Sequence, residues 1–200
     1  MTSLAATAPP PPVVAPAPLQ TFVAGPPAPA RTTHLPHGLS LARQILHNLD
    51  HQHHWSDLCV HTQSPLTSAP LPRPLVSGLP PQRLYVHPDE QVELLKRADR
   101  ERKARAKEKD EGAALDVKAA AEREWVLPTR LNEKWTLRRL AEVFDGLSMV
   151  PPAPEGSSAG HDPPQNPWRT TKRAVLASVD SDSTVVYYII HDGVVKPRQN

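Results

Sequence analysis

Two hundred residues with a formal net charge of +2 allow one modest domain plus tails and exclude a chain-wide electrostatic attraction to nucleic acid. The single cysteine, Cys59, excludes an internal disulfide and fits a reducing intracellular compartment. The longest apolar run, from Val185 to Ile190, is too short to cross a bilayer, so we expect no membrane insertion.

Residues 1–36 are rich in Pro and Ala and nearly free of charge, which predicts a disordered tail because little apolar surface can be buried. The domain is expected over residues 37–200. Ser40 is the expected N-cap of its first helix, whose apolar face carries Leu41, Ile45, Leu46 and Leu49. Histidines gather at the end of this helix, but no Cys or acidic residues complete a ligand shell, so we expect no metal site at His47, His51, His53 and His54.

One charged helix dominates the middle of the chain. Before it, Leu58 to Val60 predicts a short strand and the Pro/Ser-rich stretch at about 62–83 predicts a loop; the helix follows at about 89–123. Between Lys96 and Lys109 basic residues outnumber acidic ones, which predicts a basic stripe on this helix. A solvated, charge-laced helix is the plain interpretation; an RNA phosphate contact and a nuclear-import signal are the alternatives. The candidate RNA contacts here are Lys96, Arg97, Arg100 and Lys103.

The C-terminal part predicts a strand, a helix and a hairpin. Trp125 to Arg130 is the expected strand, and Thr136 is the expected N-cap of a helix that ends at Asp145-Gly146. The apolar face of that helix is expected to carry Leu137, Leu140, Phe144 and Leu147. A second loop is expected at about 148–168.

Two runs rich in β-branched and aromatic residues then flank a short Asp/Ser turn, which predicts a β-hairpin. The first run spans Lys172 to Asp180 and the second Ser183 to Gly193. Because both faces of the second run are apolar, we expect it to be buried at the centre of the sheet.

Three stretches in this chain resemble one protein family. They are Leu75 to Gln91, Glu124 to Lys134, and the hairpin with its Leu-Ala-Ser-Val-Asp and Val-Val-Tyr-Tyr segments. The hairpin resembles the end of the nuclease-type domain shared by tRNA-splicing endonuclease subunits, and the three stretches together resemble the smallest, non-catalytic subunit of fungi (the Sen-fifteen type). The resemblance covers roughly residues 38–200. It implies an α/β (α+β) fold: a small mixed sheet with flanking helices that ends in a C-terminal β-hairpin.

The resemblance also implies a biological setting. In that family two catalytic and two non-catalytic subunits form a heterotetramer that removes introns from precursor tRNA, and the small subunit joins strands with a catalytic subunit across their C-terminal hairpins. We therefore expect these subunits as partners, precursor tRNA within the complex, no cofactor, and a nuclear location, with the cytosolic face of mitochondria as the alternative. The expected interface and core residues are Val185, Val186, Tyr187, Tyr188, Ile189 and Ile190.

Catalytic relatives use a Tyr, His and Lys triad without a metal. The order of segments puts His61 where the Tyr falls, and Glu122 and Arg123 where the His falls. Only the Lys position is basic, filled by Lys172 or Arg173, which are also candidate RNA contacts. One basic group of the three can bind phosphate but cannot run acid–base chemistry, so we expect no catalysis.

Two alternative functions stay open from the sequence. One is an independent RNA-binding module that uses the basic stripe from Lys96 to Lys109. The other is a nuclease with a displaced triad made of Tyr188, His191 and Lys196, against which the segment order of the family speaks.

Overall fold

The computed structural model describes residues 17, 36–106, 119–154 and 166–193, so the expected tail over 1–36 lies outside the described residues except for Ala17 and Pro36. The elements, in chain order, are α2 (Pro36–His51), β1 (Ser56–Gln63), β2 (Pro70–Leu79), α3 (Pro88–Ala106), β3 (Glu124–Arg130), α4 (Leu137–Asp145), β4 (Arg173–Val179) and β5 (Val185–His191). The strands form one five-stranded sheet in the order β1-β2-β3-β4-β5. Neighbouring strands are antiparallel except β3 and β4, which are parallel. The expected fold class, a mixed sheet that ends in a hairpin, is confirmed.

The two faces of the sheet bury separate cores because successive residues of a strand point to opposite sides. On β3, Val126 packs in the core beneath α2, together with Leu41 and Ile45 of that helix. Trp125 and Leu127 point the other way, into the core that includes Phe144 of α4. β3 is therefore the central strand of the sheet, and its residues from Glu124 to Thr129 are all buried.

β2 occupies the middle of the stretch at about 62–83 that the sequence predicted to be a loop. Its three prolines, at 70, 72 and 74, precede the residues that pair with β3, which are Val76, Ser77 and Gly78. A proline cannot donate to a ladder, so it is tolerated where a strand has no neighbour on that side. The composition therefore hid a strand whose half paired with β3 is free of proline.

Helix ends agree with the sequence at α4 but not at α2. Thr136 caps α4, accepting a hydrogen bond from Arg139 N at 3.3 Å, and Gly146 closes it. The expected apolar face is only partly right, because Leu137 is 86% exposed whereas Val143 and Phe144 are buried. Ser40 is not the cap of α2, which begins at Pro36; proline suits the first turn because that turn leaves its N–H groups unused.

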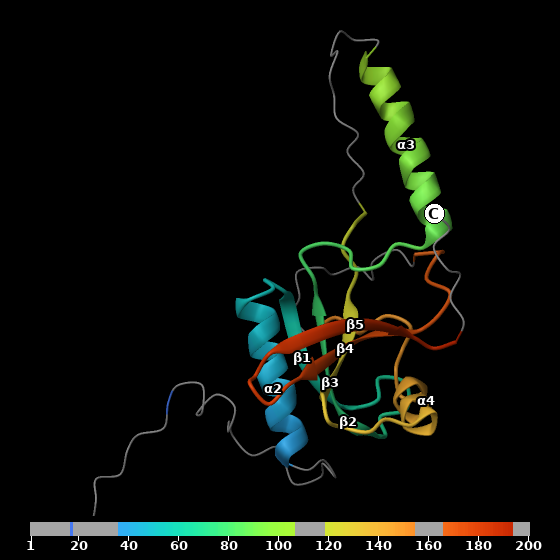
Figure 1. Cartoon of the computed structure of the whole chain (residues 1–200). Helices are drawn as coiled ribbons and strands as arrows, with labels where there is room; N and C mark the ends of the chain where they lie inside the picture. The colour runs from blue at the N-terminus through green and yellow to red at the C-terminus, as the bar shows by residue number, and fades with distance from the viewer. Residues whose placement is uncertain (1–16, 18–35, 107–118, 155–165, 194–200) are drawn as a thin grey trace, which may run out of the picture.

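α3 extends away from the sheet (Figure 1) and is shorter than expected. Residues 119–123 are not helical, although the prediction extended the helix to 123, and residues 107–118 lie outside the described residues. Arg83 Nε donates to Ala120 O at 2.7 Å, so that carbonyl is engaged by a side chain rather than by a helix. Among the described helices, none is long and apolar enough to cross a membrane.

The hairpin is confirmed, but the position of its second strand in the sheet is not. β4 and β5 pair in uninterrupted register from Arg173↔His191 to Val179↔Val185. β5 lies at the edge of the sheet, not at its centre, and Val186, Tyr188 and Ile189 are exposed. The expected burial of both of its faces is therefore wrong for the isolated chain.

Candidate functional site

The exposed edge strand β5 is the first candidate site, and it carries all six hairpin residues that the sequence singled out. Val185 and Tyr187 pack against the core under α2, and Ile190 packs against the other core. The remaining side chains are open to solvent: Val186 is 43%, Tyr188 57% and Ile189 38% exposed. Exposed apolar side chains on an edge strand are typical of a surface that binds another protein.

The backbone of β5 has an outer edge that pairs with no strand in the described part of the chain. At the two ends of the hairpin, Asp192 N donates to Lys172 O at 2.8 Å and Asp180 N donates to Thr184 O at 2.9 Å. Hydrogen-bonded pairs recur at every second residue of an antiparallel ladder. Val186, Tyr188 and Ile190 therefore direct their N–H and C=O groups to β4. Those of the residues between them, Tyr187 and Ile189 included, point to the free edge.

The opposite edge of the sheet, β1, is less suited to pairing. Its register with β2 shifts between Ser56 and Cys59 and again between His61 and Gln63. Asp57 also adopts a positive φ of 50°, which bends the strand at its start. Bulges and irregular backbone are the usual protection of an edge against unwanted pairing. Of the two edges, β5 is the more regular, since its register with β4 has no shift.

His61 stands at the position that the resemblance gives to a catalytic Tyr, and its surroundings are those of a neutral structural group. Its Nε2 is 2.8 Å from Ser77 Oγ, and its ring meets Trp125 edge-on at 4.8 Å between centroids. Burial, assisted by the charge of Arg123, lowers the pKa of His61 to about 4. Because Ser77 is fully buried, the pair offers no accessible nucleophile.

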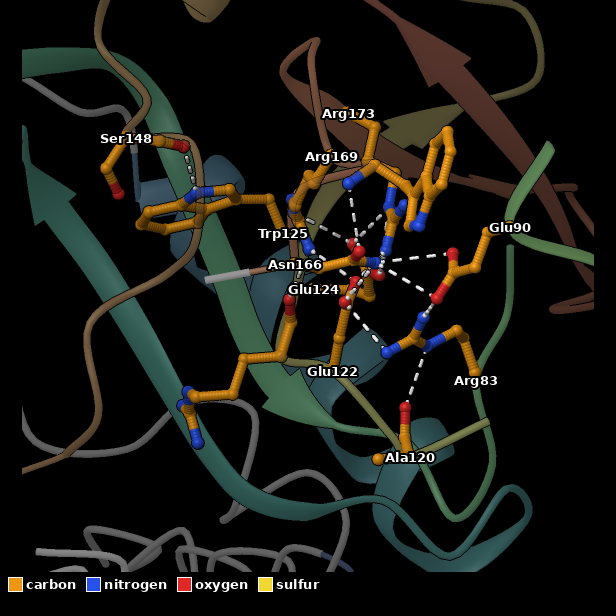
Figure 2. A network of polar contacts seen from close by, with 12 residues as sticks. Arg83, Glu90, Ala120, Glu122, Glu124, Trp125, Ser148, Asn166, Arg169 and Arg173 are labelled. Atoms are coloured by element: carbon orange, nitrogen blue, oxygen red, sulfur yellow. Dashed lines mark hydrogen bonds and ion pairs between the residues drawn. The ribbon is translucent and has the colours of Figure 1, made fainter. Parts of the chain in front are cut away.

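A network of ion pairs fills the place where the other two catalytic positions fall (Figure 2). Glu122, just ahead of β3, lies 2.5 Å from Arg173 at the start of β4. Glu124 accepts two hydrogen bonds of 3.0 Å from Arg173 Nε and one of 3.2 Å from Arg169. The side chains of Glu124, Arg169 and Arg173 are 5% exposed or less, so the pairs are withdrawn from water.

Three further side chains complete this network from distant parts of the chain. Arg83 pairs with Glu90 and, at 2.9 Å, with Glu122, while Asn166 donates to Glu122 at 2.8 Å. Burial opposes ionisation of Glu122, yet the Asn166 hydrogen bond and the surrounding guanidinium charges keep its pKa below the usual range. Three guanidiniums face three carboxylates, so the set is electrically balanced. The sequence analysis did not predict this network. The only signal in the sequence was the pair of glutamates two residues apart, Glu122 and Glu124, at the start of an otherwise buried strand.

The two residues at the lysine position are both engaged inside the protein. Lys172 Nζ donates to Phe144 O at 2.8 Å, which ties the start of the hairpin to the end of α4. Arg173 is 5% exposed and its guanidinium faces carboxylates. The expected RNA contact at Arg173 therefore does not fit the structure, because a phosphate could reach that group only by breaking a buried ion pair.

The candidate RNA contacts on α3 are accessible. Lys96, Arg97 and Arg100 are exposed, and no ion pair with a carboxylate is found for them within the described part of the chain. Lys103 differs, since its Nζ lies 2.6 Å from Asp99. The stripe continues to Lys109 in the sequence, but that end lies outside the described residues.

The histidine cluster and the displaced triad show no reactive arrangement in the described ranges. The rings of His47 and His51 lie 4.1 Å apart, and His53 meets Tyr187 edge-on at 5.0 Å. Over residues 36–106, 119–154 and 166–193, no group of three or more potential metal ligands comes together. Tyr188 and His191 both lie on β5, whereas Lys196 falls outside the described residues.

Comparison with known proteins decides the family. A family model described as "Sen15 protein" matches residues 44–200. The chain belongs to the Sen15 family. Within the family, a relative from Neurospora crassa is called "Probable tRNA-splicing endonuclease subunit tsp-1"; it is 42% identical over 167 residues, which are 82% of this chain and 67% of the relative.

A second member of the family comes from Schizosaccharomyces pombe and is called "Probable tRNA-splicing endonuclease subunit sen15". It is 34% identical over 79 residues, which are 38% of this chain and 50% of the relative. The three sequence stretches resembled the fungal Sen-fifteen type, and these matches confirm that resemblance.

Proposed function

We propose that this chain is a non-catalytic structural subunit of the tRNA-splicing endonuclease and that it pairs with a catalytic subunit through the free edge of β5. The observation that carries the proposal is the combination on one strand of outward-pointing backbone groups and the exposed side chains of Val186 and Tyr188. A strand added to this edge receives hydrogen bonds from the backbone and buries those side chains at once. Membership of the Sen15 family, whose relatives are called endonuclease subunits, supports another endonuclease subunit as the partner.

The absence of catalysis in this proposal is supported by the state of the catalytic positions. Acid–base cleavage of RNA needs a group that removes the 2′-hydroxyl proton and another that protonates the leaving oxygen. The neutral His61 is hydrogen-bonded to a buried serine, Glu122 is ionised, and Arg173 is held between carboxylates. None of these side chains both reaches solvent and can exchange a proton near neutral pH. In this proposal cleavage resides in the other subunits, and the heterotetramer acts on precursor tRNA.

The experiment is affinity capture of the tagged chain from its own cells, followed by a cleavage assay on intron-containing precursor tRNA. The variant Val186→Lys/Tyr188→Lys changes exposed side chains only, and Leu66→Lys is the matched control because Leu66 is 57% exposed in the β1–β2 connection. We expect the amounts of co-captured partner protein and of cleavage activity to be at least ten times lower with the first variant than with the control. Equal recovery from both would contradict pairing at β5. Cleavage by the purified chain alone would contradict the non-catalytic role.

A second candidate function, an independent RNA-binding module, is favoured by one observation on α3. Lys96, Arg97 and Arg100 lie within two turns of an exposed helix that extends away from the sheet, where the phosphate backbone of RNA is accessible to them. This candidate predicts that the isolated chain binds tRNA and that affinity falls steeply with salt. Replacing the three cations by Gln should abolish that binding and leave partner capture unchanged.

For the location we propose the nucleus, with the cytosolic face of mitochondria as the alternative. Fluorescent tagging of the chain at its own locus distinguishes the two.

A further inference from the structure

A pocket of about 450 Å³ opens on the side of the molecule where α2 begins and β3 ends. Its walls come from five places: the first turns of α2, the proline-rich half of β2, the last residue of β3, the segment after β3, and α4. No residue of β5 and none of the ion-pair network lines it. The pocket is therefore separate from the surface assigned above to the partner strand.

The buried part of the pocket lining, here called the floor, is apolar. Leu41 and Val143 form part of it and are 3% and 2% exposed. Gly38 brings α2 close to β2, since a Cβ at that position would lie 3.3 Å from Pro74 Cδ. A pre-formed apolar depression of this volume accommodates one or two bulky side chains of another protein.

The rim is cationic. Arg73 and Arg139 share one carboxylate, that of Glu133, at 2.9 and 2.8 Å. Burial opposes ionisation of Glu133, yet its hydrogen bonds and the Arg73 charge keep its pKa below the usual range. Arg130 donates to His37 Nε2 at 2.9 Å and has no carboxylate partner within the described residues.

The second acidic residue of the lining does not balance this charge. Glu142 pairs at 3.2 Å with Arg138, which is not part of the lining. Of the three arginines in the lining, Arg73 and Arg139 therefore share the carboxylate of Glu133, and Arg130 pairs with no carboxylate of the described residues. In addition, Arg73 Nε is buried and has no hydrogen-bond partner among the described residues. The rim is complementary to an added negative charge.

The aromatic wall distinguishes a protein ligand from RNA. Arg73 and Arg139 lie over the ring of Trp135, 5.0 and 4.8 Å from its centroid. The indole N–H of Trp135 donates a hydrogen bond to Thr129 Oγ1 at 2.8 Å. The ring is therefore held by the protein itself and offers no free platform of the kind that unpaired bases stack on. The floor consists of aliphatic groups and proline rings, which cannot read the polar edge of a base.

We infer that this pocket is a second docking site, which takes an acidic segment of a partner protein with a bulky apolar side chain as its anchor. The anchor enters the floor at Leu41 and Val143, and flanking carboxylates meet Arg130 and the arginines of the rim. Arginine and tryptophan around a buried apolar depression are typical of the centre of a protein interface. Through the identity of the partner, the inference rests on the proposed function.

The experiment places a photoreactive residue at the pocket in the assembled complex. Asn132 lines the pocket and is exposed, so Asn132→p-benzoylphenylalanine is made in the tagged full-length chain, with Leu66→p-benzoylphenylalanine as the control. The complex is captured from its own cells, its subunits are identified, and it is then irradiated. The same measurement is repeated with Arg130→Glu and, as a charge-matched control on α3, with Arg100→Glu.

We expect a cross-link from position 132 to a segment that carries both carboxylates and a bulky apolar residue, at least five times stronger than from position 66. Arg130→Glu should reduce it at least fivefold, and Arg100→Glu should not. A cross-link to RNA, to residues 1–35 of this chain, or to nothing above the control overturns the inference. If the captured proteins are not endonuclease subunits but the cross-link meets these criteria, the proposed function fails and the docking site stands. If endonuclease subunits are captured and the cross-link is absent, only the docking site fails.

Discussion

Glu122 and Arg173 form an ion pair with a separation of 2.5 Å between carboxylate and guanidinium. By the family resemblance these are positions of the catalytic His and Lys, one ahead of β3 and the other at the start of β4. Because the parallel pairing of β3 and β4 brings the two strand starts together, residues 51 positions apart in the chain become neighbours. The geometry that would assemble a catalytic pair here holds a salt bridge instead.

The buried network should contribute strongly to stability. In Glu124→Gln the neutral amide leaves Arg169 and Arg173 with too little negative charge in a site that is 1% exposed. We expect the free energy of unfolding to fall by about 3 kcal/mol or more, as when one partner of a buried pair is removed. Urea unfolding measures it, with the exposed Glu101→Gln on α3 as the control. A loss below about 1 kcal/mol would contradict a strong contribution of the network to stability.

Adjacent tyrosines of β5 should respond differently to loss of their hydroxyl. Tyr187 OH donates to Asn48 Oδ1 at 2.5 Å, joining β5 to α2, whereas Tyr188 is 57% exposed. Tyr187→Phe should cost about 1 kcal/mol of unfolding free energy, the usual value of one such hydrogen bond. Tyr188→Phe should be within about 0.5 kcal/mol of the wild type. Thermal and urea unfolding of both variants check this, and equal effects would contradict the assignment of Tyr187 as the tie to α2.

Stability should fall as the pH drops from about 6.5 to about 4, in part because of His61. The folded protein lowers the pKa of His61 to about 4, whereas an unfolded His titrates near ~6.5, so protons favour the unfolded chain. The contribution is therefore complete above pH ~6.5 and is lost on acidification. The full shift corresponds to about 3 kcal/mol, and we expect roughly 2 because the site is partly exposed to screening solvent.

The variant His61→Gln isolates this effect. The pKa of His191 is also lowered, by burial and then by Arg173 and Arg169, so the wild type has a second contribution in the same range. The measured quantity is thus the difference between wild type and His61→Gln in unfolding free energy at pH 7 and at pH 5. Parallel pH profiles would contradict a neutral, buried His61.

Proline substitution should separate the inner and outer hydrogen bonds of β5. The N–H of Ile189 points to the free edge, so Ile189→Pro keeps the ladder to β4 and removes one outward donor. We expect a folded chain by circular dichroism with at least tenfold weaker capture of the partner. Ile190→Pro removes a donor to β4 and should unfold the hairpin. Full partner capture by a folded Ile189→Pro chain would contradict strand addition at this edge.

Local signals in the sequence predicted local features well. Thr136 and Gly146 marked the ends of α4, and the stretch of mixed character from Trp125 to Arg130 marked β3, because caps and strand composition act within a few residues. β2 was missed because three prolines argue against a strand unless its unpaired side is known. That side is a property of the sheet and not of the segment.

The site was harder to predict because its parts come from distant segments. Arg83 meets Glu122 and Asn166 meets Glu90 only through the fold, and no spacing in the chain announces either contact. The apolar pattern of β5 was read as central burial for a related reason. Apolar residues on both faces indicate that a strand is to be buried, but they do not indicate whether its own chain or another protein buries it.

The uncovered edge of β5 also makes the amount of this protein in the cell a matter of consequence. A chain made in excess of its partner keeps an unpaired strand edge with apolar side chains in water, the template on which sheets of unrelated or identical chains extend. The backbone amides along the outer edge of β5 therefore require that the chain is made in balance with its partner or that unpaired chain is degraded rapidly.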